Sequence, residues 1–184
     1  MSERILIVDD HPLTRDALSS LLGAGGFDVV GEAADGAAAL ELAHSLQPDL
    51  VLLDLSMPGL DGLSALPRLR AAAPGCEVVV LTASGTEENL LAAIRGGAAG
   101  YLLKSEPPER IVAFLRGVAN GEAALSAREV EVLLLLDDHL ATDDIAKRLF
   151  ISEHTVRSHV KSLLRKLGVS SRRDALEQLA IARR

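Results

Sequence analysis

The sequence contains few cysteine and aromatic residues and lacks tryptophan altogether. Cys76 is its single cysteine, so an internal disulfide is excluded and a reducing cytoplasm is the expected location. Aromatic residues make up only 2% of the 184 positions, which means that the cores must be built from Leu, Val, Ile and Ala. No apolar run approaches the roughly 20 residues needed to cross a bilayer, so we expect no association with a membrane.

The composition that remains is that of a folded protein with unevenly distributed charge. Hydrophobic residues account for 48% and charged residues for 24%, which excludes a disordered tail, and the length suits two domains. Residues 1–121 hold eight Lys and Arg against sixteen Asp and Glu, whereas residues 147–184 hold ten against three. A basic end on an acidic protein indicates a nucleic-acid-binding module.

Residues 1–120 alternate between short apolar runs and helix-like segments. The runs are continuous rather than alternating, as in Ile5-Leu6-Ile7-Val8 and Leu50-Val51-Leu52-Leu53. Such runs, each followed by a helix, predict an α/β domain with a parallel sheet that is covered on both faces. The expected strands are 4–8, 29–33, 49–53, 77–81 and 101–103, and the expected helices are 12–22, 36–46, 63–72, 87–95 and 108–120.

Polar residues follow four of the five predicted strands. Asp9 and Asp10 end the first and Asp54 the third, while Thr82 and Lys104 follow the fourth and fifth. Because the carboxyl ends of parallel strands meet at one edge of a sheet, we expect these side chains to gather there. Unpaired carboxylates would be costly, so the site should hold a hard cation such as Mg²⁺. A carboxylate beside that metal is a plausible nucleophile toward phosphorus, although each residue taken alone is commonplace at a sheet end.

The last third of the chain is predicted to be helical. A capping box begins at Ser126, Thr142 caps a short helix, and Ser152 caps a longer one that ends before Gly168. A last helix is expected from residue 171 or 172 onward. In the helix of residues 153–167, an apolar stripe lies opposite a basic face, which fits helix-turn-helix geometry. A merely solvated basic face is the alternative.

Residues 1–120 resemble a response-regulator receiver domain, which has the flavodoxin-like (βα)5 fold with strand order 2-1-3-4-5. The matching motifs are VDDHP at 8–12, LDLSMPGLDG at 53–62, LTA at 81–83 and GYLLK at 100–104. The resemblance implies that a sensor histidine kinase phosphorylates Asp54. It also implies Mg²⁺ ligands: Asp10, Asp54 and the backbone carbonyl of Ser56, with Asp9 acting largely through water.

Three further residues match receiver positions with known roles. Thr82 and Tyr101 correspond to the switch pair, in which the hydroxyl moves toward the phosphoryl group and the ring turns inward. Lys104 corresponds to the lysine that pairs with phosphoryl oxygens. Pro58, Gly59 and Gly62 are interpreted as residues that shape the loop after Asp54, and His11 as a loop residue rather than a base or ligand.

Residues 125–182 resemble a LuxR-type helix-turn-helix domain of four helices. The matching stretches are residues 125–129, 145–157 and 164–169. By position, Arg157, Ser158 and Lys161 would face base edges, the last helix would form a dimer contact, and the weaker candidates, mainly for phosphates, are Thr155, His159, Arg165 and Lys166. Asp143-Asp144 and His139 depart from the family, which often has basic or amide residues and glycine at these positions.

Together these features predict a receiver domain (1–120), a short linker (121–125) and a LuxR-type DNA-binding domain (126–184). We expect a two-component response regulator that is phosphorylated on Asp54, forms a homodimer on activation and binds a double-stranded DNA operator. One alternative is a phosphorylation-independent regulator that uses the receiver only as a dimerisation scaffold. A Mg²⁺-dependent phosphatase is the other, but the chain lacks a substrate cap domain, so no enzyme is expected.

Overall fold

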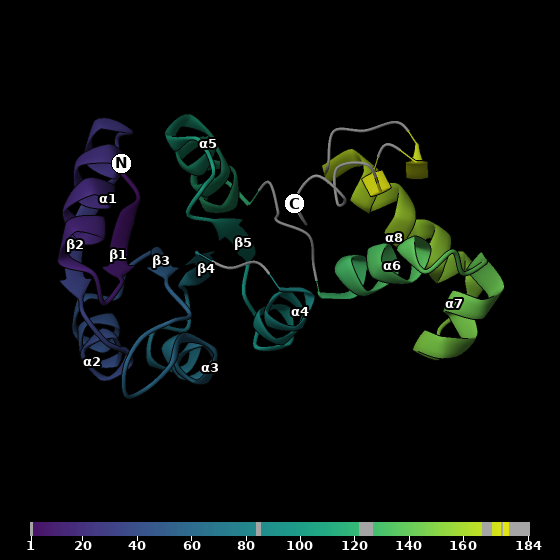
Figure 1. The fold of residues 1–184 in the computed structure, drawn as a ribbon, viewed down its shortest axis with the longest axis horizontal. Helices are drawn as coiled ribbons and strands as arrows, with labels where there is room; N and C mark the ends of the chain where they lie inside the picture. The colour runs from purple at the N-terminus through teal and green to yellow at the C-terminus, as the bar shows by residue number, and fades with distance from the viewer. Residues whose placement is uncertain (1, 84–85, 122–126, 167–170, 174, 177–184) are drawn as a thin grey trace. The chain divides into compact units, whose positions relative to one another are not determined.

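A computed structural model describes residues 2–83, 86–121, 127–166, 171–173 and 175–176 (Figure 1). The chain divides into two compact units, 1–122 and 123–184. Apart from Gly121, the predicted linker lies outside the described residues, as does the predicted cap at Ser126. No helix in the described ranges is long and apolar enough to span a membrane.

The first unit is built on a five-stranded parallel sheet with strand order β2-β1-β3-β4-β5, which confirms the predicted flavodoxin-like topology (Figure 1). Because β1 and β3 lie inside the sheet, their apolar runs are completely buried on both faces. The strands are β1 (Arg4–Val8), β2 (Asp28–Ala33), β3 (Leu50–Leu53), β4 (Glu77–Thr82) and β5 (Gly100–Leu103).

Five helices cover the two faces of this sheet. In Figure 1, α1 and α5 lie on one face and α2, α3 and α4 on the other. Side-chain caps fix several helix starts: Asp35 accepts hydrogen bonds from two amides of α2, and Asp61 accepts one from the amide and one from the hydroxyl of Ser64 in α3. The helices are α1 (Pro12–Ala24), α2 (Gly36–Leu46), α3 (Gly62–Ala72), α4 (Glu87–Arg95) and α5 (Pro108–Ala119).

The second unit contains α6 (Ala127–Asp137), α7 (Thr142–Leu149) and α8 (Glu153–Lys166). Its core is aliphatic, as the shortage of aromatic residues predicts, and Val156 and Val160 pack from α8 against apolar residues of α6 and α7. The predicted last helix is described only at 171–173 and 175–176, where Ala175 packs against Leu133 and Leu163. Its continuation lies outside the described residues.

One predicted cap is confirmed and another is wrong. The Ser152 hydroxyl accepts a hydrogen bond from the Thr155 amide at 3.1 Å, so it caps α8 as predicted. Thr142 is instead the first helical residue of α7, and Ala141 occupies the cap position without a side-chain hydrogen bond. The Thr142 hydroxyl stands one position too far along the chain to cap, and it accepts a hydrogen bond from Arg172 at 3.3 Å.

Both turns that flank α7 contain a non-glycine residue in the left-handed region. His139 has φ 58° in the turn before α7, and Phe150 has φ 54° just after it. His139 thus adopts the conformation that glycine adopts most readily.

Candidate functional site

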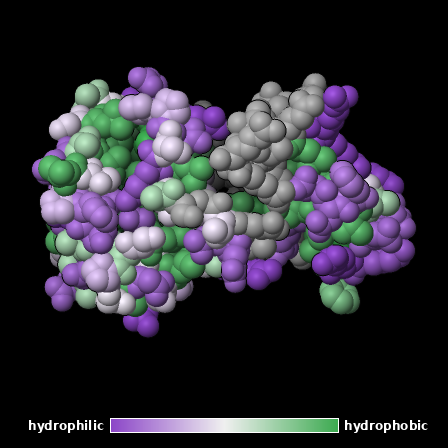
Figure 2. Space-filling model, in the orientation of Figure 1, coloured by the Kyte–Doolittle hydropathy of each residue, from purple (hydrophilic) through white to green (hydrophobic). Residues whose placement is uncertain are grey.

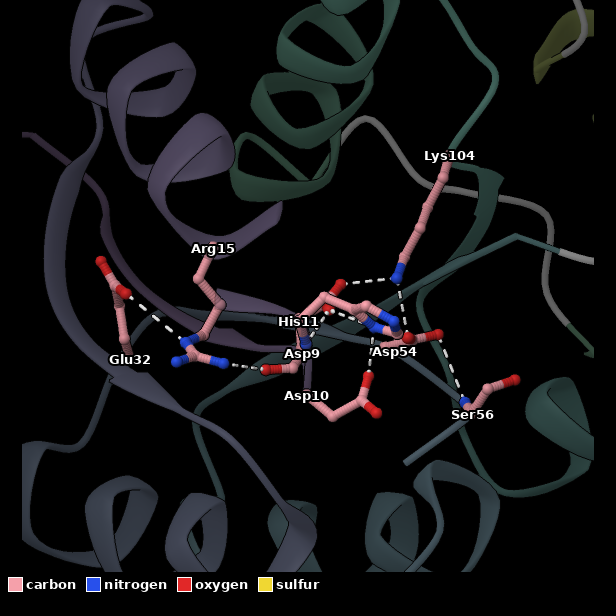
Figure 3. Close-up of polar contacts among 8 residues, drawn as sticks. All are labelled: Asp9, Asp10, His11, Arg15, Glu32, Asp54, Ser56 and Lys104. Carbon is pink, nitrogen blue, oxygen red and sulfur yellow. Dashed lines mark hydrogen bonds and ion pairs between the residues drawn. The ribbon is translucent and has the colours of Figure 1, made fainter. Parts of the chain in front are cut away.

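The edge formed by the ends of β1, β3 and β5 holds two buried carboxylates and one ammonium (Figure 3). Asp9 follows β1 and is 1% exposed, and Asp54 follows β3 and is 3% exposed. Lys104 follows β5 and reaches across the end of β4, so that its Nζ lies 2.6 Å from Asp9 Oδ2 and 2.7 Å from Asp54 Oδ2. The predicted juxtaposition of these three residues is therefore present.

Charge at this edge is only partly compensated. Burial of the Lys104 ammonium lowers its pKa, but hydrogen bonds to Asp54 and Asp9 and their charges raise it by more, so the net pKa is raised. The lysine is therefore charged at neutral pH and balances one of the two buried carboxylates. Asp10 adds a third carboxylate nearby, which leaves the edge electronegative and suited to a cation.

Asp10 and His11 form the more exposed side of the site. Asp10 Oδ1 lies 2.7 Å from His11 Nδ1, and the His11 amide donates to Asp9 Oδ1 at 2.9 Å. Ligand atoms of Asp9, Asp10 and His11 lie within 4.8 Å of one another. Carboxylate oxygens are the donors that Mg²⁺ prefers, so the two aspartates fit that metal better than the largely exposed imidazole does.

Backbone contacts fix the loop that carries Asp54. The Asp54 amide donates to the Val8 carbonyl at 2.8 Å, and the Ser56 amide donates to Asp54 Oδ1 at 3.3 Å. Gly62 packs so closely that a Cβ there would collide with the Asp54 carbonyl and lie 2.7 Å from Leu55 Cα. Glycine therefore lets the start of α3 approach the carboxylate loop.

Thr82 lies on β4, next to the strand that Asp54 follows, and Tyr101 lies on β5, one strand further. Thr82 is buried at the end of β4, and its carbonyl accepts the Lys104 amide at 2.8 Å. Tyr101 pairs in register with Val80 and packs half-buried against the main core, and burial raises its pKa. Both predicted switch residues thus belong to the framework that holds the carboxylate edge.

Arg15 is a site residue that our sequence analysis missed. From the start of α1, its Nη1 donates to the Asp9 carbonyl at 2.6 Å, and its Nε lies 3.6 Å from Glu32 on β2 (Figure 3). This arginine ties the Asp9 turn to two neighbouring elements. A basic residue in the first turn after an acidic strand end is the signal that could have identified it.

The second unit presents polar residues along one side of α8. Arg157, Ser158 and Lys161 are exposed, whereas Val156 and Val160 are buried, so the predicted apolar and polar faces are both present. Hydrophilic residues dominate the visible surface around α7 (Figure 2). The side chains of the predicted phosphate contacts Arg165 and Lys166 lie outside the described residues.

Two cations of this unit are paired with acids of the same helix. Arg157 Nη2 lies 2.6 Å from Glu153 Oε2 on α8. On α7, Lys147 Nζ lies 3.3 Å from Asp143 and 3.4 Å from Asp144. The pairing lowers the pKa of Asp143 and raises that of Lys147.

The two other predicted phosphate contacts on α8 are half-buried. Thr155 and His159 are both of intermediate exposure, and the Thr155 hydroxyl lies 2.8 Å from that of Ser152. The Thr155 hydroxyl is thus already engaged at the start of the helix.

The fold and the carboxylate edge define the first unit as a receiver domain, and the second unit has the helices of a helix-turn-helix domain. Comparison with protein families agrees with both. The family described as "Response regulator receiver domain" matches residues 5–116, and "Bacterial regulatory proteins, luxR family" matches residues 123–178.

Relatives extend this match over almost the whole chain. The chain is 39% identical to the nitrate/nitrite response regulator protein NarL of Escherichia coli (strain K12), over 93% of this chain and 92% of that protein. Among solved structures, the receiver domain of a NarL response regulator from Mycobacterium tuberculosis is 39% identical, with a TM-score of 0.62, and covers 65% of this chain and 98% of its own. Response regulator ChrA of a heme-sensing two-component system is 35% identical, with a TM-score of 0.55, and the match covers 99% of this chain and 98% of that chain.

The chain belongs to the NarL/LuxR family of two-component response regulators, which act as transcription factors.

Proposed function

We propose that Asp54 is the phosphoacceptor of this response regulator and that its phosphorylation by a sensor histidine kinase controls dimerisation and binding to operator DNA. The single observation that carries the proposal is the contact of one ammonium, Lys104, with two buried carboxylates, Asp9 and Asp54. A carboxylate held in this way is oriented as a nucleophile. Once this carboxylate is phosphorylated, the ammonium can move to a phosphoryl oxygen.

Mg²⁺ fits the donors at this edge, which are predominantly carboxylate oxygens. Asp10, Asp54 and the Ser56 carbonyl would hold the ion, with Asp9 acting through water. When bound, the ion would neutralise charge between the carboxylates and an anionic phosphoryl donor. Thr82 and Lys104 would then bind the oxygens of the transferred group, and Tyr101 would follow Thr82 in the activated form.

For the DNA-binding unit, we propose that α8 is the recognition helix. Arg157, Ser158 and Lys161 are placed on its exposed side, where side chains can reach base edges in the major groove. Thr155, His159, Arg165 and Lys166 remain weaker candidates, mainly for backbone phosphates. A homodimer would match two half-sites of an operator, and the whole chain would act as a cytoplasmic switch rather than as an enzyme.

The test is phosphorylation of the purified full chain by acetyl phosphate and Mg²⁺. We expect wild type and an exposed control, Asp28→Asn, to gain the mass of one phosphate, and Asp54→Asn to gain none. Binding to a DNA sequence that the wild type selects from random duplexes is then measured with and without the phosphoryl donor.

Affinity should rise on phosphorylation in wild type and stay constant in Asp54→Asn. A phosphate on the Asp54→Asn protein would assign the wrong acceptor. Equal DNA affinity of phosphorylated and unphosphorylated wild type would favour the constitutive regulator with an inert receiver.

A further inference from the structure

Four cations on α7 and α8, among those whose side chains the structure describes, fall into two groups. Lys147 and Arg157 are each paired with a carboxylate of their own helix. Arg148 and Lys161 are exposed, and no acid contacts either of them within the described part of the chain. Of these four cations on α7 and α8, two are therefore available to an approaching duplex at once and two must first leave a partner.

We propose that Glu153 determines specificity by holding Arg157 in an ion pair that is exchanged for a matched base but not for a phosphate. The inference rests on the proposed role of α8 as the recognition helix. Arg157 Nη2 lies 2.6 Å from Glu153 Oε2 one turn earlier, and the two side chains are 62% and 48% exposed. The pair thus lies on the solvent side of α8 and near its N-terminal end, the end that enters the groove in helix-turn-helix proteins.

The relative strengths of the competing contacts support such an exchange. An exposed ion pair four residues apart on a helix is weak, so a bidentate contact of arginine with guanine, which discriminates on the order of tenfold to a hundredfold, can replace it. A contact with a single phosphate is much weaker than such a base contact. Leaving Glu153 for a phosphate would also expose its carboxylate to the negatively charged backbone. Arg157 should therefore stay paired on unmatched DNA and change partner only at its target base.

The arrangement on α7 works in the same direction. Asp143 and Asp144 both lie within ion-pair distance of Lys147, so the start of α7 carries net negative charge instead of a free cation. This arrangement gives the two acidic residues that depart from the family a physical role: they lower the attraction that the unit has for any duplex, whatever its sequence.

The experiment measures the binding of full-length protein to its selected DNA sequence and to a scrambled duplex over a range of salt concentrations. Glu153→Gln keeps the size of the side chain and leaves the Ser152 cap intact, but removes the ion pair. We expect affinity for scrambled DNA to rise several-fold, with a log–log salt slope steeper by about 0.9, because one more phosphate is neutralised. Affinity for the selected sequence should rise less, so the ratio of the two affinities falls.

Two variants locate the effect. Asp138→Asn makes the same change in charge at an exposed position outside α7 and α8, and should shift both affinities equally. Adding Arg157→Ala to Glu153→Gln should abolish the gain in salt slope. Equal gains on both duplexes in Glu153→Gln, or a slope gain that persists in the double variant, would overturn the inference while leaving the proposed function intact. Failure of wild type to select any sequence would overturn both.

Discussion

At the scale of single residues, Lys104 is held by two ion pairs at the carboxylate edge. Its ammonium contacts two buried carboxylates at once, and its own side chain is only 20% exposed. Any cation that binds the carboxylate edge must compete with this ammonium for Asp9 and Asp54. We therefore expect the lysine to stabilise the metal-free site and to weaken its affinity for metal.

Replacing Lys104 by methionine should separate these two effects. We expect the metal-free Lys104→Met protein to be less stable by about 1–3 kcal/mol, because two buried carboxylates lose their partner. Its affinity for Mg²⁺ should rise several-fold, because the competing ammonium is gone. Chemical denaturation with and without Mg²⁺ gives the first quantity and titration calorimetry the second. A variant that binds Mg²⁺ more weakly than wild type would show that Lys104 supports the metal site rather than competing for it.

Residue types at strand ends were sufficient to predict which side chains meet at this edge. Asp9, Asp54 and Lys104 follow apolar runs, and a parallel sheet brings such positions together whatever the details of packing. The contacts of Arg15 with the Asp9 carbonyl and with Glu32 were not predicted from the strand ends. They depend on the side-chain rotamers of long residues, which the hydrophobic pattern does not constrain.

At the scale of secondary-structure elements, the turn between α7 and α8 combines two unfavourable features in one residue. Phe150 follows the last helical residue of α7 with φ 54°, a conformation that suits glycine or asparagine. Its ring is 95% exposed and gains almost nothing from packing. The backbone bears the cost of the left-handed conformation without compensation from the side chain.

Phe150→Asn should therefore stabilise the second unit. We expect a gain of roughly 0.5–1 kcal/mol in its free energy of unfolding, since asparagine tolerates the left-handed region better than phenylalanine does. Denaturant unfolding, monitored by circular dichroism, measures this gain. Phe150→Ala is the control, because it removes the ring but keeps the backbone cost. A similar gain in the alanine variant would mean that the ring, and not the backbone, is responsible.

The helix boundaries show where local sequence signals suffice. The prediction of Ser152 as a cap is confirmed, because this hydroxyl residue stands one helical turn before Val156, where the apolar stripe of α8 begins. The prediction for Thr142 is wrong because its hydroxyl lies inside the first turn, and the cap position falls on Ala141, whose side chain has no hydrogen-bond acceptor. A hydroxyl residue near a helix start is thus a cap only in the right register.

At the scale of the whole molecule, the two units have separate aliphatic cores, and their proposed ligands carry opposite charge. The first unit builds its core around the sheet, and the second around α6, α7 and α8. The proposed metal would bind only the first and the proposed operator only the second. Because a ligand stabilises the unit that binds it, each ligand should raise the stability of one unit without the other.

We therefore expect the intact chain to unfold in two thermal transitions. Mg²⁺ should raise the midpoint of one transition, and the selected DNA sequence should raise the midpoint of the other, by mass action on the folded unit. Differential scanning calorimetry measures both midpoints, with magnesium-free buffer plus NaCl at matched ionic strength as the control for Mg²⁺. A single transition that moves with either ligand would show that the two units unfold cooperatively.

The fold and the family could be predicted from the sequence because each depends on many residues at once. Continuous apolar runs specify a parallel sheet over the first 120 residues, and one altered residue does not change that pattern. The proposed specificity of the DNA contacts depends on a few exposed side chains. Helical spacing allows a pair such as Glu153 and Arg157, and the structure shows that this pair forms.

The shortage of aromatic residues has a practical consequence for optical spectroscopy. The chain holds one tyrosine and no tryptophan, so its near-ultraviolet fluorescence comes almost entirely from Tyr101. That ring is half-buried on the strand that ends beside Lys104. Tyrosine emission thus reports on the first unit without an attached dye, whereas the second unit contains neither tyrosine nor tryptophan. A change in emission when only the second unit binds its ligand would be direct evidence of communication between the units.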